Sequence, residues 1–203
     1  KTAEQLRHEI EELQLLRRKT GLPRLIIATD QEGGMVSRLS PPLEKRPSLA
    51  VLVSNLNRDA SLKEAETYGS MQGKELAHLG VTVNFSPVVD LQSETVHNKL
   101  DFHSFINQRA ISPSPGQTTD IALAYGRGLV SQGVRATLKH FPGLGGVGTD
   151  THHFSATLKT PIDELALRDW VPFQNVAQQS KALIMLSHVV LSQVDENNPV
   201  SFS

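Results

Sequence analysis

The stretch QTTDIALAYGRGLVSQGVRATLKHF, residues Gln117 to Phe141, decides the fold because it joins a helical pattern to a buried strand. Residues 117–132 have the apolar spacing of a helix, whereas residues 134–141 are short, apolar and β-branched at their start, as in a strand. Pro142 and Gly143 follow and forbid further regular structure. This pairing of one helix with one strand predicts an α/β fold.

The same helix-then-strand alternation recurs along the chain. The other three pairs are Thr2 to Lys19 with Leu25 to Thr29, Ser61 to Leu79 with Val81 to Val89, and Pro161 to Ser180 with Ala182 to Leu191. Successive units of this kind predict a parallel sheet with right-handed crossovers.

Polar residues occur toward the end of each predicted strand. They are the run from Asp30 to Gly34, the segment Asn84 to Asp90, the pair Lys139 and His140, and the pair Ser187 and His188. A (β/α)₈ barrel gathers functional groups from many strand ends, whereas a doubly wound sheet gathers them at one switch point. We therefore predict a TIM-barrel-like fold. Because a complete barrel takes about 250 residues, we expect the 203 residues to be the middle of one incomplete catalytic domain, lacking elements at both ends.

Two long segments, Ser40 to Arg58 and Leu91 to Gly116, exceed ordinary loop lengths, and we expect them to be irregular functional loops. The composition limits the function further. With 20% charged residues and a net charge of -1, the chain predicts no nucleic-acid partner. Its lack of cysteine excludes disulfides and thiolate nucleophiles, and no apolar run reaches the roughly 18 residues of a membrane span.

Ionisable residues cluster where the strand of residues 134–141 ends. Lys139 and His140 lie at its tip, and Asp150 and His152 lie beyond a glycine-rich loop. A carboxylate two residues from a histidine can bind one imidazole nitrogen and raise the basicity of the other, which suits a general acid/base. An Asx-turn beside an exposed histidine is the alternative. The neighbouring Lys139 and His140 favour the active-site interpretation.

Further candidates lie elsewhere in the chain. Asp30 and Arg38 bracket the pair Gly33 and Gly34, an arrangement that lets backbone approach a ligand while charged groups bind its hydroxyls. Asp30 as a helix N-cap, with turn glycines after it, is the alternative. Arg109 is either a further ligand-binding side chain or a solvated surface residue.

Three more side chains have open or structural interpretations. We expect Asp90 to be structural and to tie down the long loop that follows it. His188 is equally compatible with a histidine satisfied in the core and with a pocket wall. A metal-dependent hydrolase using His140, His152 and His188 is a competing hypothesis, although no helical zinc motif is present.

With these residues identified, the chain resembles the bacterial β-N-acetylhexosaminidases of glycoside hydrolase family 3. The resemblance rests on ATDQEGGMVSRL at Ala28 to Leu39, NFSPVVDL at Asn84 to Leu91, and KHFPGLGGVGTDTHH at Lys139 to His153. Leu144 and Met35 depart from the family pattern at positions beside the sugar contacts. We expect these two differences to affect which substrate is preferred more than the class of reaction.

The resemblance implies a retaining hydrolase that removes terminal β-linked N-acetylglucosamine. It makes His152 and Asp150 the catalytic acid/base pair, and it assigns five side chains to sugar binding: Asp30, Arg38, Arg109, Lys139 and His140. We expect Asp30→Ala and Lys139→Ala to affect folding little. The family's nucleophile is an aspartate after a later strand, so we expect the 203 residues alone to be inactive; Asp195 lies in a polar turn and is not assigned.

The implied substrate is a small carbohydrate, a muropeptide derived from peptidoglycan or a chitooligosaccharide, and the implied location is the cytoplasm, with a secreted or periplasmic one as the alternative. No cofactor and no metal are predicted. Two other functions remain open. A family 3 β-glucosidase is similar but usually takes its acid/base carboxylate from a second domain, and a barrel that only binds sugar would gain little from the pair of Asp150 and His152.

Overall fold

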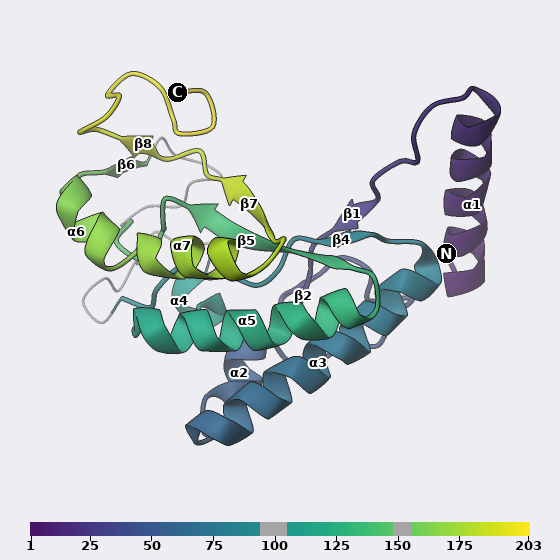
Figure 1. Ribbon diagram of the computed structural model, residues 1–203, viewed down its shortest axis with the longest axis horizontal. Helices are drawn as coiled ribbons and strands as arrows, with labels where there is room; N and C mark the ends of the chain where they lie inside the picture. Colours follow the sequence, from purple (N-terminus) through teal and green to yellow (C-terminus); the bar gives the residue numbers. More distant parts are fainter. Residues whose placement is uncertain (94–104, 148–155) are drawn as a thin grey trace.

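The computed structural model describes residues 1–93, 105–147 and 156–203 (Figure 1). Its central feature is a four-stranded sheet in the order β1 (Ala28–Thr29), β4 (Val83–Asn84), β5 (Arg135–Phe141) and β7 (Leu183–Leu186). All three strand pairings are parallel. The predicted α/β fold with a parallel sheet is confirmed.

Three helices connect these strands and lie side by side on one face of the sheet: α3 (Arg58–Leu79), α5 (Pro115–Ser131) and α7 (Trp170–Gln179) (Figure 1). The strands follow one another in chain order, with no reversal. A doubly wound sheet reverses its strand order at a switch point and carries helices on both faces, whereas a barrel does neither. The topology is therefore of the barrel type.

Shorter elements surround this core. Helix α1 (Ala3–Lys19) stands at the β1 end of the sheet, and a small ribbon of β6 and β8 stands at the β7 end (Figure 1). The remaining elements are β2 (Gln31–Gly33), β3 (Val36–Ser37), α2 (Leu49–Val53), α4 (Ile106–Arg109), β6 (Thr157–Leu158), α6 (Ile162–Leu167) and β8 (Val190–Leu191). Among the helices of the described residues, none has the length and hydropathy needed to cross a membrane.

The helix ends follow local sequence signals. Thr2 caps α1 in a capping box with Gln5, and Asn57 caps α3 by accepting a hydrogen bond from the backbone N–H of Ala60. Helix α3 ends at Gly80, whose φ of +89° few other residues adopt readily. The predicted helices at residues 2–19, 61–79 and 117–132 are confirmed to within three residues at each end.

The strand predicted over residues 182–191 is divided between β7 and β8, which belong to different sheets. Two other predicted elements are interrupted by proline. The strand predicted over residues 81–89 pairs regularly only at Val83 and Asn84, since Pro87 has no N–H for a ladder. The helix predicted over residues 161–180 is split into α6 and α7. Pro172 is tolerated in the first turn of α7, where backbone N–H groups have no helical partner, but not within one long helix.

The segment predicted to be irregular, residues 40–58, contains helix α2. Ser48 caps this helix, and its apolar residues Leu49 and Val53 are buried in the main core. The same core includes Leu76 of α3 and Tyr125 of α5, which lie between the helices and the sheet. Packing therefore explains a helix that polarity and length alone did not predict.

Candidate active site

A cleft of about 280 Å³ lies at the carboxyl ends of the four parallel strands. All five side chains predicted to bind sugar line it, together with apolar and polar neighbours from every strand end. The lining residues are Asp30, Val36, Arg38, Phe85, Ile106, Arg109, Lys139, His140, Leu144, Met185, Leu186, Ser187 and His188. The parallel sheet thus brings together residues that are more than 100 positions apart in the chain.

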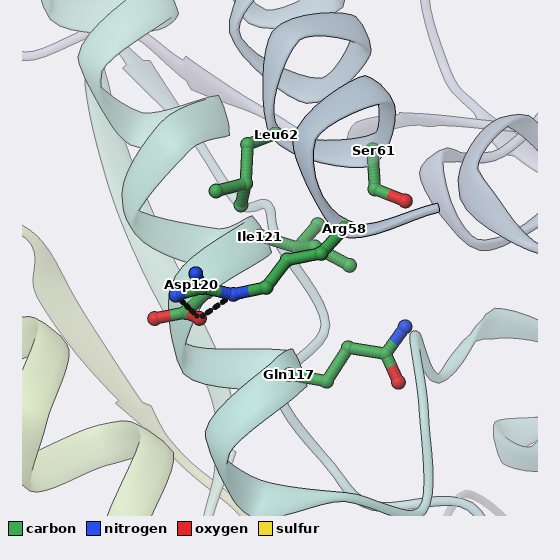
Figure 2. Close-up of a pocket in the computed structure, with 6 residues that line it drawn as sticks. All are labelled: Arg58, Ser61, Leu62, Gln117, Asp120 and Ile121. Carbon is green, nitrogen blue, oxygen red and sulfur yellow. Dashed lines mark hydrogen bonds and ion pairs between the residues drawn. The ribbon is translucent and has the colours of Figure 1, made fainter. Parts of the chain in front are cut away.

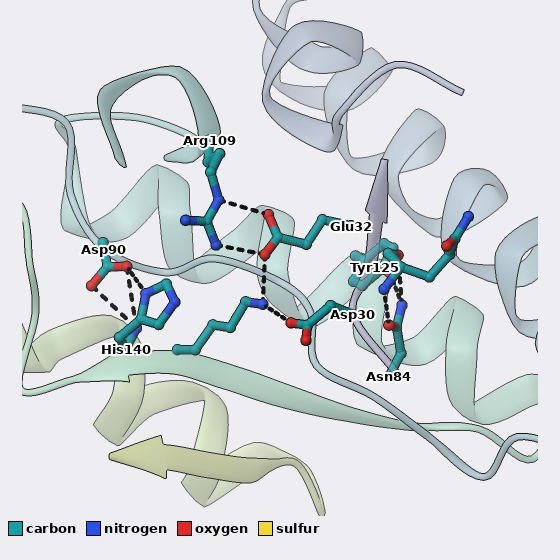
Figure 3. Close-up of polar contacts among 9 residues, drawn as sticks. Asp30, Glu32, Asn84, Asp90, Arg109, Tyr125 and His140 are labelled. Carbon is teal, nitrogen blue, oxygen red and sulfur yellow. Dashed lines mark hydrogen bonds and ion pairs between the residues drawn. The ribbon is translucent and has the colours of Figure 1, made fainter. Parts of the chain in front are cut away.

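Two cations and two carboxylates form a continuous cluster at the base of the cleft (Figure 3). Lys139 Nζ lies 2.5 Å from an oxygen of Asp30 and 2.5 Å from Oε1 of Glu32. Arg109 donates to both carboxylate oxygens of Glu32, from Nη2 at 2.6 Å and from Nε at 2.9 Å. Lys139, from β5, is therefore connected through Glu32, from β2, to Arg109, from α4.

Burial makes this pairing obligatory. The side chains of Lys139, Glu32 and Arg109 are only 2%, 5% and 9% exposed. Burial opposes the charge on Glu32, but the Arg109 and Lys139 cations prevail and lower its pKa. Asp30 is 35% exposed and so presents carboxylate oxygen to the cleft. Arg109 is thus not the solvated surface residue of the alternative interpretation, and Asp30 is an ion-pair partner instead of a helix N-cap.

Sequence reasoning missed Glu32 as a functional residue. Glu32 lies between Gln31 and the glycine pair, within the motif of Ala28 to Leu39. Its position in that motif does not indicate which cations it pairs with. Arg109 and Lys139 are distant in sequence and meet Glu32 only in the fold. The available signal was a charged residue in a strand next to glycines, a context in which an unpaired charge would be costly.

The histidine of the strand tip, His140, has its own carboxylate partner (Figure 3). His140 Nδ1 lies 2.7 Å from Oδ2 of Asp90, and the backbone N–H groups of His140 and Leu144 also donate to Asp90. Burial disfavours ionised Asp90, yet the nearby His140 and these donors lower its pKa. Asp90 is structural, as expected, but it secures the corner after β5 instead of its own loop.

A buried hydrogen-bond network supports the segment that carries Asp30 and Glu32. Asn84 exchanges two hydrogen bonds with the backbone of Gln31, at 3.0 and 2.9 Å, and donates to the hydroxyl of Tyr125. Tyr125 in turn donates to Gln72 of α3 at 2.6 Å. Strand β4 and two helices therefore fix the start of β2, which keeps Glu32 aimed at its cations.

The match to known proteins covers the whole chain. A family model described as "Glycosyl hydrolase family 3 N terminal domain" matches residues 1–203. The chain belongs to glycoside hydrolase family 3. A protein named Beta-hexosaminidase from Chromobacterium violaceum is 34% identical over 201 residues, which are 97% of this chain and 54% of that protein. A Neisseria gonorrhoeae protein of the same name is 33% identical, over 98% of this chain and 53% of its own length.

Solved structures show the same relationship. NagZ from Neisseria gonorrhoeae in complex with N-trifluoroacetyl-D-glucosamine has a TM-score of 0.85 at 33% identity, over 100% of this chain and 56% of that one. A family 3 β-N-acetylglucosaminidase from Paenibacillus has a TM-score of 0.86 at 28% identity, over 100% and 37%. The predicted TIM-barrel-like fold is confirmed. The chain spans about half the length of the named relatives it matches.

Within this family 3 domain the glycine pair has a role different from the predicted one. A Cβ on Gly33, whose φ is +93°, would lie 2.3 Å from the carbonyl oxygen of Pro47 and 2.4 Å from the hydroxyl of Tyr68. The absence of a side chain therefore allows packing against the protein itself, instead of approach to a ligand. Of the two departures from the family pattern, Leu144 lines the cleft, whereas Met35 is 53% exposed and is not among the lining residues.

Both predicted catalytic residues, Asp150 and His152, lie outside the described residues. His188 is exposed, lines the cleft and contacts Ser201 through Nδ1 at 2.8 Å, so it is a pocket wall and not a core histidine. Asp195 accepts hydrogen bonds from Asn197, Asn198 and Ser203, which confirms its place in a polar turn away from the cleft.

In the described ranges no group of three or more histidines and carboxylates is arranged to hold a metal ion. The competing metal hypothesis used His140, His152 and His188. Two of these lie at the cleft, with Nδ1 engaged by Asp90 and by Ser201 respectively, and His152 lies outside the described residues.

The lowered pKa of Glu32 predicts a specific acid sensitivity. A carboxyl whose folded-state pKa is below its unfolded value near 4.5 stabilises the fold above that value, and this stabilisation is lost as the pH falls through the folded pKa. We expect the free energy of unfolding to decrease below about pH 4.5. Glu32→Gln should flatten that decrease, measured by urea denaturation between pH 7 and 3. An equally steep decrease in Glu32→Gln and in the unsubstituted protein (the parent) would show that ionised Glu32 does not stabilise the fold.

Proposed function

We propose that this family 3 domain serves a retaining glycoside hydrolase that removes terminal β-linked N-acetylglucosamine. The observation that carries the proposal is the convergence of Asp30, Arg38, Arg109, Lys139 and His140 on one cleft at the strand ends. Paired cations and carboxylates next to apolar side chains suit a sugar, because its hydroxyls need both donors and acceptors while its ring faces are apolar.

The charge cluster is preorganised for this task. Asp30 is the most exposed of the four charged groups, and its carboxylate can accept hydrogen bonds from sugar hydroxyls. Lys139 is held between Asp30 and Glu32 and so needs no reorganisation when sugar arrives. Such fixed charges favour a transition state in which the ring flattens and its hydroxyl contacts strengthen.

Catalysis follows the retaining route in two steps. A carboxylate nucleophile attacks the anomeric carbon while His152, oriented by Asp150, protonates the leaving oxygen. The histidine then removes a proton from water, which hydrolyses the glycosyl-enzyme. An imidazole suits both steps, since its reference pKa of about 6.5 allows it to give and take a proton near neutrality. The resemblance in the Lys139 to His153 motif supports these roles.

We propose that the substrate is an N-acetylglucosamine-containing fragment derived from peptidoglycan. We also propose that the protein acts in the cytoplasm. The N-trifluoroacetyl-D-glucosamine complex of the Neisseria gonorrhoeae relative supports the N-acylated sugar. Leu144, Ile106 and Met185 give the cleft an apolar part that suits an acetamido methyl group.

A substrate comparison tests the function. We expect the full-length protein that contains this domain to hydrolyse a chromogenic β-N-acetylglucosaminide much faster than the matching β-glucoside, measured as kcat/KM for the two substrates. Equal or faster turnover of the glucoside would favour a family 3 β-glucosidase. Binding of N-acetylglucosamine without hydrolysis of either substrate would favour a barrel that only binds sugar.

A further inference from the structure

Asp90 is the most deeply buried charged residue next to the cleft, and none of its atoms line it. Asp90 is 1% exposed, and its carboxylate accepts hydrogen bonds from His140 and Leu144. Both of these partners do line the cleft. Within the described part of the chain, Asp90 is therefore hydrogen-bonded to two residues of the binding surface without lining it.

The sheet fixes Asp90 in this place. Val88 forms a parallel bridge with Lys139, and the N–H of Val89 donates to the carbonyl oxygen of Lys139 at 2.9 Å. The end of the β4 segment is thereby aligned with the tip of β5, one residue before His140. The carboxylate meets the imidazole because of this backbone register.

The hydrogen bonds determine which imidazole nitrogen carries a proton. One oxygen of Asp90 accepts from the backbone N–H of Leu144 at 2.8 Å, and the other lies 2.7 Å from Nδ1 of His140. An ionised carboxylate only accepts hydrogen bonds, so Nδ1 must be the donor. In a neutral imidazole that is protonated on Nδ1, the free lone pair is at Nε2.

We propose that Asp90 is a positioning residue for the reaction, holding His140 with its proton on Nδ1 so that Nε2 faces the sugar as a hydrogen-bond acceptor. The same carboxylate fixes Leu144, so one buried group sets both the polar and the apolar wall of the cleft. This inference rests on the proposed function, because it assumes that the cleft binds sugar.

Asp90→Asn tests the proposal because the amide cannot satisfy the same partners. Two backbone N–H groups, of His140 and Leu144, direct the amide oxygen toward themselves, which leaves the NH₂ group facing Nδ1. The imidazole must then move its proton to Nε2. We expect ¹⁵N NMR to show His140 protonated on Nδ1 in the parent and on Nε2 in Asp90→Asn.

Sugar binding supplies the second measurement. We expect Asp90→Asn to weaken N-acetylglucosamine binding and lower kcat/KM by about 10- to 100-fold, the range found when a histidine's orienting partner is removed in metal sites. Asp120→Asn is the matched control, since Asp120 pairs with Arg58 between α3 and α5, outside the cleft (Figure 2). It should leave both the His140 spectrum and sugar binding unchanged.

The outcomes separate this inference from the proposed function. If the parent binds no N-acetylglucosamine, the proposed function fails, while the NMR spectrum still reports the His140 proton. If the parent binds it and Asp90→Asn binds equally well, the positioning role is overturned. Should Asp90→Asn not fold, the spectrum of the unsubstituted protein alone decides, because a proton on Nε2 of His140, in the neutral ring or in the imidazolium, contradicts the proposal.

Discussion

His152→Ala is expected to lower kcat by about 10²- to 10⁴-fold, the usual loss when a general acid is removed. The loss should be larger for a natural disaccharide than for a nitrophenyl glycoside. A nitrophenolate departs with little protonation, whereas a sugar alkoxide needs a proton as the bond breaks. Steady-state kinetics with both substrates measure the difference.

His8→Ala is a suitable control, because His8 lies on α1 with its side chain 71% exposed and pairs with Glu12, four residues later on the same helix. It should leave kcat unchanged for both the disaccharide and the nitrophenyl glycoside. If His152→Ala reduces turnover of the nitrophenyl substrate and the disaccharide to the same extent, His152 is not the proton donor. The reaction would then need another acid at the cleft.

The second large effect concerns the charge cluster. We expect Asp30→Ala and Lys139→Ala each to lower kcat/KM. The decrease should correspond to a loss of about 2–5 kcal/mol in transition-state stabilisation, as when one partner of a buried charge pair is removed. Their effects on folding should differ. Asp30 is 35% exposed, whereas Lys139 is 2% exposed and pairs with both Asp30 and Glu32.

Burial therefore changes the expectation that these substitutions affect folding little. We still expect Asp30→Ala to affect folding little, since water can solvate the site. For Lys139→Ala we expect a destabilisation of about 3–5 kcal/mol, because buried carboxylate is left with less compensation. Urea denaturation measures this, and Lys139→Met, which keeps the apolar stem, separates the lost charge from the lost volume.

Three results would contradict this account. Full activity in folded Lys139→Met would show that the ammonium does not contribute to transition-state binding. Unchanged stability in Lys139→Ala would show that the cluster is not held together by this cation. Asp30→Ala that is inactive only because it is unfolded would make Asp30 a structural residue.

Much of the site was predictable because its residues are concentrated in short motifs at strand ends. The tip of β5 supplied Lys139 and His140 directly, and the alternation of helix and strand placed Asp30 at the same edge of the sheet. Glu32 was not predictable in this way. Its role depends on Arg109, 77 residues later, whose side chain reaches it from helix α4.

The sequence by itself determined the α/β class, the main helices and the strand ends that carry charge, because apolar periodicity and capping residues act over a few neighbouring positions. Only the tertiary structure decided the pairings: Asp90 with His140 and Glu32 with Arg109 and Lys139. These contacts join residues 50 or more positions apart. Their strength depends on burial and on sheet register, and neither is a property of a local stretch of sequence.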